Sequence, residues 1–534
     1  MKFGLIKTEG FNRGDTIALV LESRPEYVGI WLGLSKIGVV TALVNSNLVA
    51  DPLVHSLKVS DAKGVIYGSD FIKTIKDISE KTTKMKLYQL SDKTDQVELL
   101  EGSTDLRSVL EKQSDTLPEK DIQCGKPRDK LIFIYTSGTT GLPKAAVITN
   151  MRFMFMALGL NYMTSLKEND ILYDPLPLYH SAGGMVGVGQ CLLKGITVVI
   201  RRKFSASNFW NDCVKFKCTA AQYIGEICRY ILAAHNKDEK PIKHFVKKII
   251  GNGLRPQIWR TFVTKFNIEE VYEFYGATEG NSNLVNIDSK VGAVGFVPRY
   301  AGAIYPVSLI KCNEATGAPI RESDGFCRRC APGEPGVFVG NVNPKKTVND
   351  FSGYVDKKAT ESKLIENVFR KGDRYFNSGD ILVQDEFGYY YFKDRTGDTF
   401  RWKGENISTS EIEAVISNVV DLNDAVVYGV EVPGSEGRAG MVAIVDSQNT
   451  LDMGKLCRGL KKNLPSYAVP IFVRVMDSVP MTGTFKLKKT DLQQEGFNCD
   501  KIKDKLFLYD VKNVTYTKLT KDKYDDIVTG KVRL

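Results

Sequence analysis

The sequence feature that most constrains the fold is a polar loop enclosed by two apolar runs. Residues 135–144 read YTSGTTGLPK; the apolar run 131–134 precedes them and the apolar run 145–148 follows. Short apolar runs bounded by turn residues are typical of buried strands. The pattern therefore predicts a strand, a loop and a second strand. Because glycines let a ligand approach the backbone and successive N–H groups with hydroxyls suit phosphate, the loop also predicts phosphate binding.

The candidate phosphate ligands in this loop are Thr136, Ser137, Gly138, Thr139, Thr140, Gly141 and Lys144. The spacing differs from the GxxxxGK[ST] loop of P-loop NTPases, because no Ser or Thr follows Lys144 and no helix is expected there. For a Gly/Ser/Thr cluster taken alone, a polar hairpin turn is the alternative interpretation.

Repeated strand–helix–strand patterns surround the loop. Strands are expected at 15–21, 39–44 and 64–67, with a helix opening at Pro25 and another over 52–59. Strands that alternate with helices at this spacing predict a parallel sheet with helices covering it.

The same alternation continues after the loop, as far as about residue 285. An apolar helix is expected over 151–160 and helical spacing over 220–232, and strands are expected at 172–180, 197–200, 247–254 and 271–274. The charged and weakly periodic stretch 72–128 predicts a surface helix followed by a long loop.

The pattern of predicted secondary structure changes after about residue 290. Short β runs with Gly and Pro turns fill 290–392, which favours a barrel-like piece. A boundary is expected at 394–398. Beyond it, Ser408 and Glu411 form a capping box, and the following helix places apolar residues on one face.

A chain of 534 residues exceeds what one hydrophobic core usually serves, so at least two domains are expected. The predicted fold class is α/β. Residues 1–393 form a large multi-subdomain N-terminal domain with doubly wound sheets and a β-barrel-like piece, and residues 394–534 form a small α+β domain.

Composition narrows the classes of function only slightly. The net charge of +10 is mildly basic, which suits anionic substrates, an acidic membrane surface or simple solubility, and nothing points to nucleic acid. The ten cysteines are scattered, which favours free thiols. No uninterrupted apolar stretch reaches the roughly 18 residues of a membrane span. No transmembrane helix is expected in the chain as given.

Five strings occur in an order that resembles the acyl-adenylate-forming enzymes. They are 136–144, 275–279, 378–380, 394–395 and 483–486. A further string, GDTFRWKGENIS at 397–408, closely resembles the fatty acid transport proteins, which are also very-long-chain acyl-CoA synthetases. The resemblance covers essentially the whole chain.

The resemblance implies roles for residues around the triphosphate. Thr278 would contact the α-phosphate and Glu279 would help to hold magnesium; both end a predicted strand, where α/β sheets place ligands. Lys486 would be the catalytic lysine that bridges the substrate carboxylate and the α-phosphate. Lys488 and Lys489 are close alternatives, and a basic surface run is the alternative for all of them.

The resemblance also implies a nucleoside pocket. Tyr275 and the adjoining Gly276 would pack on adenine, with Gly253 in the opposite wall. Asp380 would accept hydrogen bonds from the ribose hydroxyls, although an aspartate after glycine is often a turn cap. Arg395 would reach ribose or phosphate.

Other positions are implied to serve the acyl and thiol substrates. His180 would line the acyl site, although a packed histidine at a strand end is the usual alternative. Lys403, Gly404 and Glu405 would line the coenzyme A path. Gly397 falls near the pivot of the small domain, where the family often has a charged residue, so the exact hinge stays open.

The implied reaction has two steps. A fatty carboxylate attacks the α-phosphate of ATP, releasing pyrophosphate, and coenzyme A then converts the acyl-adenylate to acyl-CoA and AMP after the small domain rotates. The alternatives are a ligase for a bile acid or another bulky carboxylate, and a transporter that has lost catalysis.

Family members carry a further N-terminal stretch with a membrane-spanning segment that residues 1–11 do not match, so a short isoform or truncated gene model is expected. Association with the endoplasmic reticulum or plasma membrane, with the catalytic part cytosolic, is also expected. Attachment would then be peripheral, with a tendency to aggregate. The oligomeric state stays open.

Overall fold

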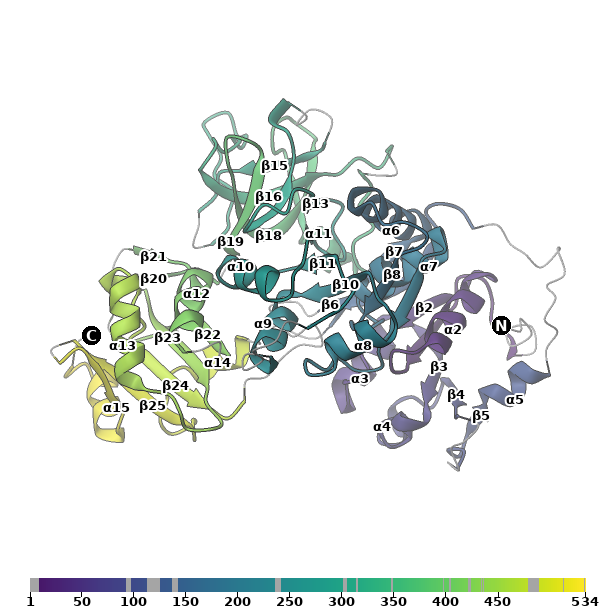
Figure 1. The fold of residues 1–534 in the computed structure, drawn as a ribbon, viewed down its shortest axis with the longest axis horizontal. Helices are drawn as coiled ribbons and strands as arrows, with labels where there is room; N and C mark the ends of the chain where they lie inside the picture. The colour runs from purple at the N-terminus through teal and green to yellow at the C-terminus, as the bar shows by residue number, and fades with distance from the viewer. Residues whose placement is uncertain are drawn as a thin grey trace.

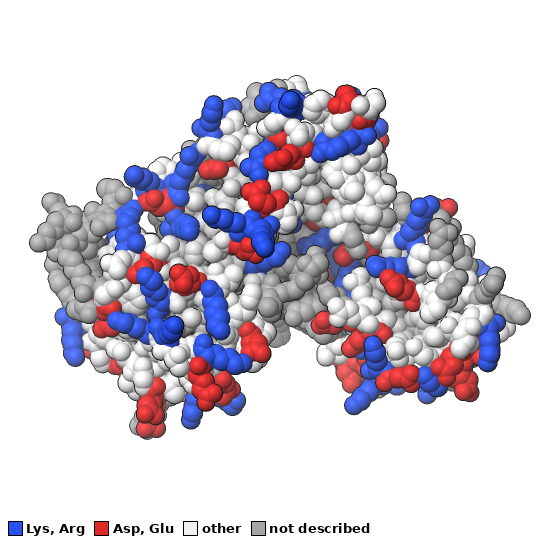
Figure 2. All heavy atoms as spheres, turned by 180° about the vertical axis from the view of Figure 1, so that it is seen from behind, with Lys and Arg blue, Asp and Glu red and all other residues white. Residues whose placement is uncertain are grey.

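The computed structural model describes residues 9–92, 98–112, 125–136, 143–235, 242–300, 305–313, 316–346, 349–396, 398–402, 405–420, 424–433, 435, 437–478, 489–511, 513–532 and 534. Figure 1 shows two neighbouring α/β layers on the right and centre, an antiparallel sheet above them, and a separate lobe on the left that contains the C-terminus. From behind, a hollow separates this lobe from the remainder (Figure 2).

The first sheet contains the strands on either side of the polar loop. Its order is β5-β4-β3-β1-β2-β6-β7, with β1 Thr16–Val20, β2 Val40–Leu43, β3 Ala62–Gly68, β4 Lys86–Leu90, β5 Ser103–Asp105, β6 Lys130–Thr136 and β7 Lys144–Thr149. All neighbours are parallel except β6 and β7, which are antiparallel. The predicted strands on both sides of the loop are thus confirmed.

Helices accompany this sheet, namely α2 Pro25–Ser35, α3 Ala50–Val59, α4 Ile72–Lys76 and α5 Leu106–Glu111. Successive residues of a strand point to opposite faces. In β1, Ile17 and Leu19 join one buried cluster with Trp31 of α2, whereas Ala18 and Val20 join another with Leu53 of α3. Both faces are therefore covered, as a doubly wound sheet requires.

For residues 72–128 the predicted surface helix is found as α4, but the long loop that was expected after it is wrong in the part that the structure describes. Strands β4 and β5 extend the sheet there. The pattern was hidden because Gln89 interrupts the apolar run although it is fully buried. Its side-chain oxygen accepts a hydrogen bond from the backbone N–H of Leu100, which satisfies the buried polar group.

A second sheet follows with the order β13-β12-β11-β10-β8-β9. Its strands are β8 Ile171–Asp174, β9 Thr197–Ile200, β10 Ala220–Ile224, β11 Lys248–Asn252, β12 Glu270–Gly276 and β13 Asn283–Asn286. Its helices are α6 Asn150–Thr164, the π-helix η4 Ser181–Gly187, α7 Val188–Lys194, α8 Phe209–Lys215, α9 Gly225–Ala234 and α10 Pro256–Lys265. Only β13 pairs antiparallel.

Two expectations for this sheet need correction. The strand predicted for 172–180 ends at Asp174, because Pro175 and Pro177 have no N–H to give to a strand ladder. Residues 220–224, where helical spacing was expected, form the fully buried strand β10, and the helix begins only at Gly225. A short apolar run does not distinguish a buried strand from a buried helix.

The β-rich stretch 290–392 forms an antiparallel sheet of order β14-β19-β18-β16-β15, with β17 paired to β18. The elements are β14 Ala293–Phe296, β15 Val307–Ile310, β16 Pro335–Asn341, α11 Lys357–Glu361, β17 Leu364–Glu366, β18 Arg374–Gln384 and β19 Tyr389–Arg395. Strand β19 leads directly toward the C-terminal lobe (Figure 1).

The C-terminal lobe has its own sheet of order β22-β23-β24-β25-β26 and a separate hairpin. The hairpin is β20 Phe400–Trp402 and β21 Glu405–Ile407; the other elements are α12 Thr409–Val419, β22 Ala425–Glu431, β23 Arg438–Val445, α13 Met453–Asn463, β24 Phe472–Met476, α14 Thr490–Glu495, β25 Lys505–Asp510, β26 Thr515–Lys518 and α15 Lys521–Val528. The Ser408 part of the predicted capping box is confirmed, because the Ser408 side chain accepts from the Glu411 N–H.

Within the part of the chain that the structure describes, no helix combines the length and the apolar character needed to cross a bilayer.

Candidate active site

Tyr354 connects the strand after the polar loop to the predicted Thr-Glu pair. It forms a bridge with Ala146 of β7, and its hydroxyl donates to Glu279 Oε1 at 2.7 Å. Lys144 Nζ lies 5.8 Å from the centre of its ring. Lys144 and Glu279 therefore both lie beside the Tyr354 side chain. Sequence reasoning missed Tyr354, since a single tyrosine in a loop has no local signature.

Glu279 lies in a positively charged, mostly enclosed setting. Its side chain is 8% exposed, and Lys363 Nζ lies 3.8 Å from Oε1. Arg152 of α6 donates to the backbone oxygen of Ala277 at 3.1 Å. Burial lowers the pKa of Arg152 to about 10 against the opposing effect of Glu279, so the guanidinium stays charged at neutral pH. These cations suit a polyphosphate, and sequence reasoning missed both Arg152 and Lys363.

Thr278 meets the segment that was predicted to border the acyl site. Its Oγ1 lies 3.2 Å from the Oγ of Ser181, which is the first residue of η4. His180 directly precedes this π-helix, and its ring centre lies 4.5 Å from that of Tyr179. π-Helical turns occur frequently at functional sites. The π-helix packs tightly against the residues that precede it, because a Cβ added at Gly184 would lie only 2.2 Å from the backbone oxygen of Leu178.

Asp174 at the end of β8 faces the same π-helix from the core. A Cβ added at Gly187 would lie 2.4 Å from Asp174 Oδ2 and 2.6 Å from Gln222 Oε1, so both oxygens point at this glycine. Burial raises the pKa of Asp174 to about 8, although the Leu176 N–H opposes the shift. At pH 7 the carboxyl is therefore mainly neutral.

Tyr275, Asp380 and Arg395 come together from three strands. The Tyr275 hydroxyl donates to Asp380 Oδ2 at 2.6 Å, and Arg395 Nε lies 3.7 Å from Asp380 Oδ1. Burial, followed by the charge of Asp380, raises the pKa of Tyr275 well above its ordinary value, so the hydroxyl remains a donor. Asp380 lies within β18 opposite Arg395 in β19, which excludes the turn-cap alternative.

Glu273 holds the turn that contains Gly253. Its buried carboxyl accepts from the N–H groups of Gly253 and Leu254 and from the Tyr223 hydroxyl. Burial raises the pKa of Glu273 to about 8, and the three donors oppose the shift. Gly253 has a φ of +83°, and a Cβ at Gly225 would overlap its carbonyl oxygen. The predicted pocket wall is therefore a rigid turn, and Glu273 is a supporting residue that was missed.

The remaining predicted residues divide into those the structure describes and those it does not. Thr136 ends β6, and a Cβ at Gly276 would lie 2.3 Å from Asn283 Oδ1, so a side chain there would require the Asn283 side chain to move. Glu405 begins β21 and is exposed. Outside the described residues lie Ser137, Gly138, Thr139, Thr140, Gly141, Gly397, Lys403, Gly404, Lys486 and Lys488.

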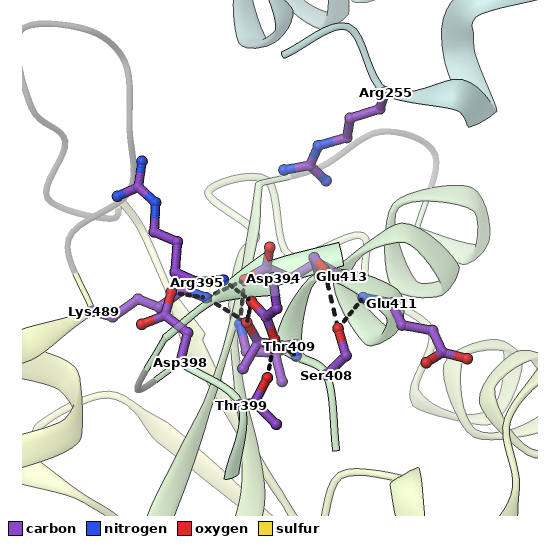
Figure 3. A network of polar contacts seen from close by, with 12 residues as sticks. Arg255, Asp394, Arg395, Asp398, Thr399, Ser408, Thr409, Glu411, Glu413 and Lys489 are labelled. Atoms are coloured by element: carbon purple, nitrogen blue, oxygen red, sulfur yellow. Dashed lines mark hydrogen bonds and ion pairs between the residues drawn. The ribbon is translucent and has the colours of Figure 1, made fainter. Parts of the chain in front are cut away.

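Hydrogen bonds connect the end of β19 to the first residues of the C-terminal lobe (Figure 3). Asp394 Oδ2 accepts from the Thr399 hydroxyl at 2.7 Å and from the Thr409 N–H at 3.0 Å. The Asp394 backbone belongs to β19, whereas both donors belong to the lobe. One carboxyl group thus ties the strand to the start of α12.

A second link between the lobe and the large sheets is electrostatic. Arg229 of α9 forms ion pairs with Glu226 at 2.8 Å and with Asp424, which directly precedes β22. The side chains of Arg229 and Asp424 are only 6% and 16% exposed. Glu226 is shared with Arg255 at 2.9 Å.

Comparison with known proteins gives consistent matches. The model described as AMP-binding enzyme matches residues 4–320, and the one described as AMP-binding enzyme C-terminal domain matches 411–486. The chain is 48% identical to "Long-chain fatty acid transport protein 1" of Rattus norvegicus over 521 residues, which are 98% of this chain and 80% of the relative. It is 40% identical to "Long-chain fatty acid transport protein 6" of Mus musculus over 534 residues, covering 99% and 85%.

Solved structures confirm the fold class. ATP-bound MatB from Rhodopseudomonas palustris matches with a TM-score of 0.73 and 22% identity, covering 92% of this chain and 90% of that one. A fatty acyl CoA synthetase of Mycobacterium tuberculosis matches with a TM-score of 0.60 and 23% identity, covering 92% and 89%.

Proposed function

Because the chain belongs to the AMP-binding enzymes and, among them, to the long-chain fatty acid transport proteins, we propose that it activates long-chain and very-long-chain fatty acids for uptake. The chain is an AMP-forming acid–thiol ligase, and ATP and coenzyme A are its co-substrates. Uptake would be driven by trapping the acid as its thioester.

In the first step, a carboxylate oxygen of the fatty acid attacks the α-phosphorus of ATP, the bond to the β-phosphate breaks, and pyrophosphate leaves. The phosphate loop with Lys144 would hold the β- and γ-phosphates. Thr278 would contact the α-phosphate, and Lys486 would offset the charge that builds as one anion attacks another. The cations Arg152 and Lys363 beside Glu279 support this placement of a triphosphate.

Magnesium would be held by Glu279. Magnesium in nucleotide sites is usually bound through one or two carboxylates together with the phosphate oxygens and water. Glu279 provides one such carboxylate, and among the described residues no cluster of three or more His, Cys, Asp or Glu forms an all-protein cage. This donor set fits magnesium that arrives with ATP. The ion would neutralise the phosphate oxygens.

The nucleoside would be held by residues that the structure has already organised. Tyr275 would pack on adenine while its hydroxyl orients Asp380 toward the ribose hydroxyls. The rigid turn at Gly253 would form the opposite wall, and Arg395 would reach ribose or phosphate. His180, beside the π-helix, would border the acyl group.

In the second step, the thiol of coenzyme A attacks the acyl carbonyl, and AMP leaves with the electron pair of the broken bond. We divide the chain for this step into a body, 1–393, and a rotating domain, 394–534. The change of sheet between β19 and β20 supports this division. Rotation would bring Lys403, Gly404 and Glu405 to the coenzyme A path.

The observation that most supports the proposal is that Lys144 and Glu279, which are far apart in the sequence, both lie beside Tyr354. The test is to incubate the purified chain with ATP, magnesium, coenzyme A and saturated fatty acids of increasing length, with cholate in parallel. Acyl-CoA and AMP should form in equal amounts from long chains, because each turnover releases one of each. A preference for cholate would favour the bile-acid alternative, and tight fatty acid binding without product would favour the non-catalytic transporter.

We also propose that the chain associates peripherally with the endoplasmic reticulum or plasma membrane, with its catalytic part cytosolic. Helix α6 supports this proposal, because its exposed apolar side chains are Met154, Phe155, Leu158, Tyr162 and Met163. The triple replacement of Phe155, Leu158 and Tyr162 by serine should reduce co-flotation with anionic vesicles, whereas Phe387→Ser at another exposed site should not. Equal flotation of both variants would contradict a role for α6.

A further inference from the structure

The π-helix η4 packs on one face of two neighbouring strands of the second sheet. Strand β10 pairs with β8 so that Ala220 lies opposite Leu172, and both residues share a buried cluster with Val186 of η4. Two residues further along each strand, and therefore on the same face, are Gln222 and Asp174. The two polar side chains thus lie in the part of the core that η4 covers.

Gln222 holds the first turn of η4. Its Nε2 donates to the backbone oxygen of Ala182, the second residue of η4, at 3.0 Å. Because a carbonyl oxygen can only accept, this bond fixes the orientation of the amide and leaves Oε1 on the other side. Gln222 Oε1 and Asp174 Oδ2 both face Gly187, at 2.6 and 2.4 Å from the position that a Cβ there would take.

These two oxygens are acceptors in a place that water does not reach. Both side chains are fully buried, and neither Asp174 Oδ2 nor Gln222 Oε1 has a hydrogen-bond partner among the described residues. A buried acceptor without a partner costs free energy, and an ionised one costs more. A negative charge on Asp174 would also be repelled by the amide oxygen of Gln222. The arrangement therefore suits a neutral Asp174.

The first turn of η4 also contacts the predicted ligand of the α-phosphate. Ser181 directly precedes Ala182, and its Oγ lies 3.2 Å from Thr278 Oγ1. Arg152 of α6 donates to the backbone oxygen of Thr278 at 3.5 Å. Thr278 is thus held by η4 through its side chain and by α6 through its backbone. Only one residue separates the bond made by Gln222 from the contact with Thr278.

Resting on the role proposed above for Thr278, we propose that Asp174 and Gln222 are positioning residues for adenylate formation. They fix the first turn of η4, so that Ser181 keeps the Thr278 hydroxyl in place for the α-phosphate. Both are buried beneath η4 and act through it.

The proposal gives adenylate formation a specific dependence on pH. Burial raises the pKa of Asp174 to about 8, and the Leu176 N–H opposes the shift. The titratable side chains that adjoin it on β8, β9, β10 and η4 are Tyr173, Arg201, Tyr223 and His180, and none of them contributes to the shift. The raised pKa means that the neutral form is lost as the pH rises through about 8. The step should slow over the same range.

The first test compares the wild-type chain with Asp174→Asn, which resembles the neutral carboxyl and cannot ionise. At pH 7 both should catalyse fatty-acid-dependent pyrophosphate exchange at rates within about twofold. Between pH 7 and pH 9 the rate of Asp174→Asn relative to wild type should rise about 10-fold, because only the wild type loses its neutral form. The ratio cancels every ionisation that both proteins share. Asp77→Asn, at an exposed position after α4, is the matched control, and its ratio to wild type should stay constant.

The second test follows the route through η4. Gln222→Met keeps the length of the side chain but cannot donate to Ala182, and Ser181→Ala removes the contact with Thr278. Each should slow the exchange about 10-fold at pH 7, as expected for one lost buried hydrogen bond. If both act through Thr278, the double variant should be no slower than the slower single variant, whereas independent sites would add in free energy.

The outcomes separate the inference from the proposed function. A constant ratio of Asp174→Asn to wild type, or additive losses in the double variant, would overturn the inference while the exchange itself persists. Asp174→Asn keeps the test decisive where Gln222→Met does not fold, since it changes neither the size nor the neutral charge of the group. A wild-type chain that forms no acyl-adenylate at any pH would overturn the proposed function.

Discussion

Replacing Lys486 by alanine is expected to reduce fatty-acid-dependent pyrophosphate exchange by about 10²–10³-fold, or about 3–4 kcal/mol, the effect of removing a donor to a developing oxyanion. In adenylate formation, a carboxylate approaches a phosphate that is already negative, so a cation between them stabilises the transition state more than the ground state. Thioester formation from supplied acyl-adenylate should be affected much less, since that step has no such meeting of anions.

The neighbouring lysines supply the controls for this result. Lys488→Ala should retain most of the exchange activity. Lys489 forms ion pairs with Asp398 and Glu413, so its conservative replacement by arginine, which keeps the charge, should retain part of the activity. The assignment of Lys486 is wrong if both half-reactions fall equally in Lys486→Ala. It is also wrong if Lys488→Ala causes the larger loss.

The second large effect is expected from Gly404→Leu, and it should appear in the thioester step. A leucine side chain in the coenzyme A path would displace the thiol from its line of attack, and a misplacement of about 1 Å can cost on the order of 10²-fold in rate. Adenylate formation takes place before the lobe rotates and should proceed normally. Acyl-adenylate should therefore accumulate on the enzyme, where quenching and chromatography detect it.

An exposed position elsewhere in the lobe is the control for this variant. Val511→Leu, in the turn between β25 and β26, places a leucine at an exposed position of the same domain and should leave both half-reactions unchanged. Unchanged turnover of coenzyme A in Gly404→Leu would remove the proposed role of the 403–405 segment.

Sequence patterns were informative wherever the determinants are local. The strands beside the polar loop are continuous apolar runs, and the capping box at Ser408 spans only four residues. Both could be predicted because strand burial and helix capping depend on neighbouring residues. The strand β10 could not be recognised in this way, because it is short and every residue in it is buried, Gln222 included, so its sequence shows no alternation.

The supporting residues of the candidate site could not be predicted in this way. Tyr354 reaches Glu279 across 75 residues of sequence. Arg152 lies on a mostly apolar helix and becomes informative only when its contact with the Ala277 carbonyl is seen. From the sequence alone, Glu273 could equally be a solvent-exposed acidic residue of a strand. Only the structure shows that three donors hold its buried carboxyl group. These roles depend on which loops the sheets bring together, and no local pattern encodes that.

The ion pair between Arg229 and Asp424 has a kinetic consequence for the domain rotation. Rotation of the lobe must break this pair: Arg229 retains Glu226, but Asp424 loses the partner with which it is enclosed in the present orientation. Removing one member of an enclosed pair is costly, so orientations between the two end states are disfavoured. The lobe should therefore not drift continuously. It should dwell in a discrete state and leave it in rare, abrupt events, so that dwell times in single-molecule records follow one exponential.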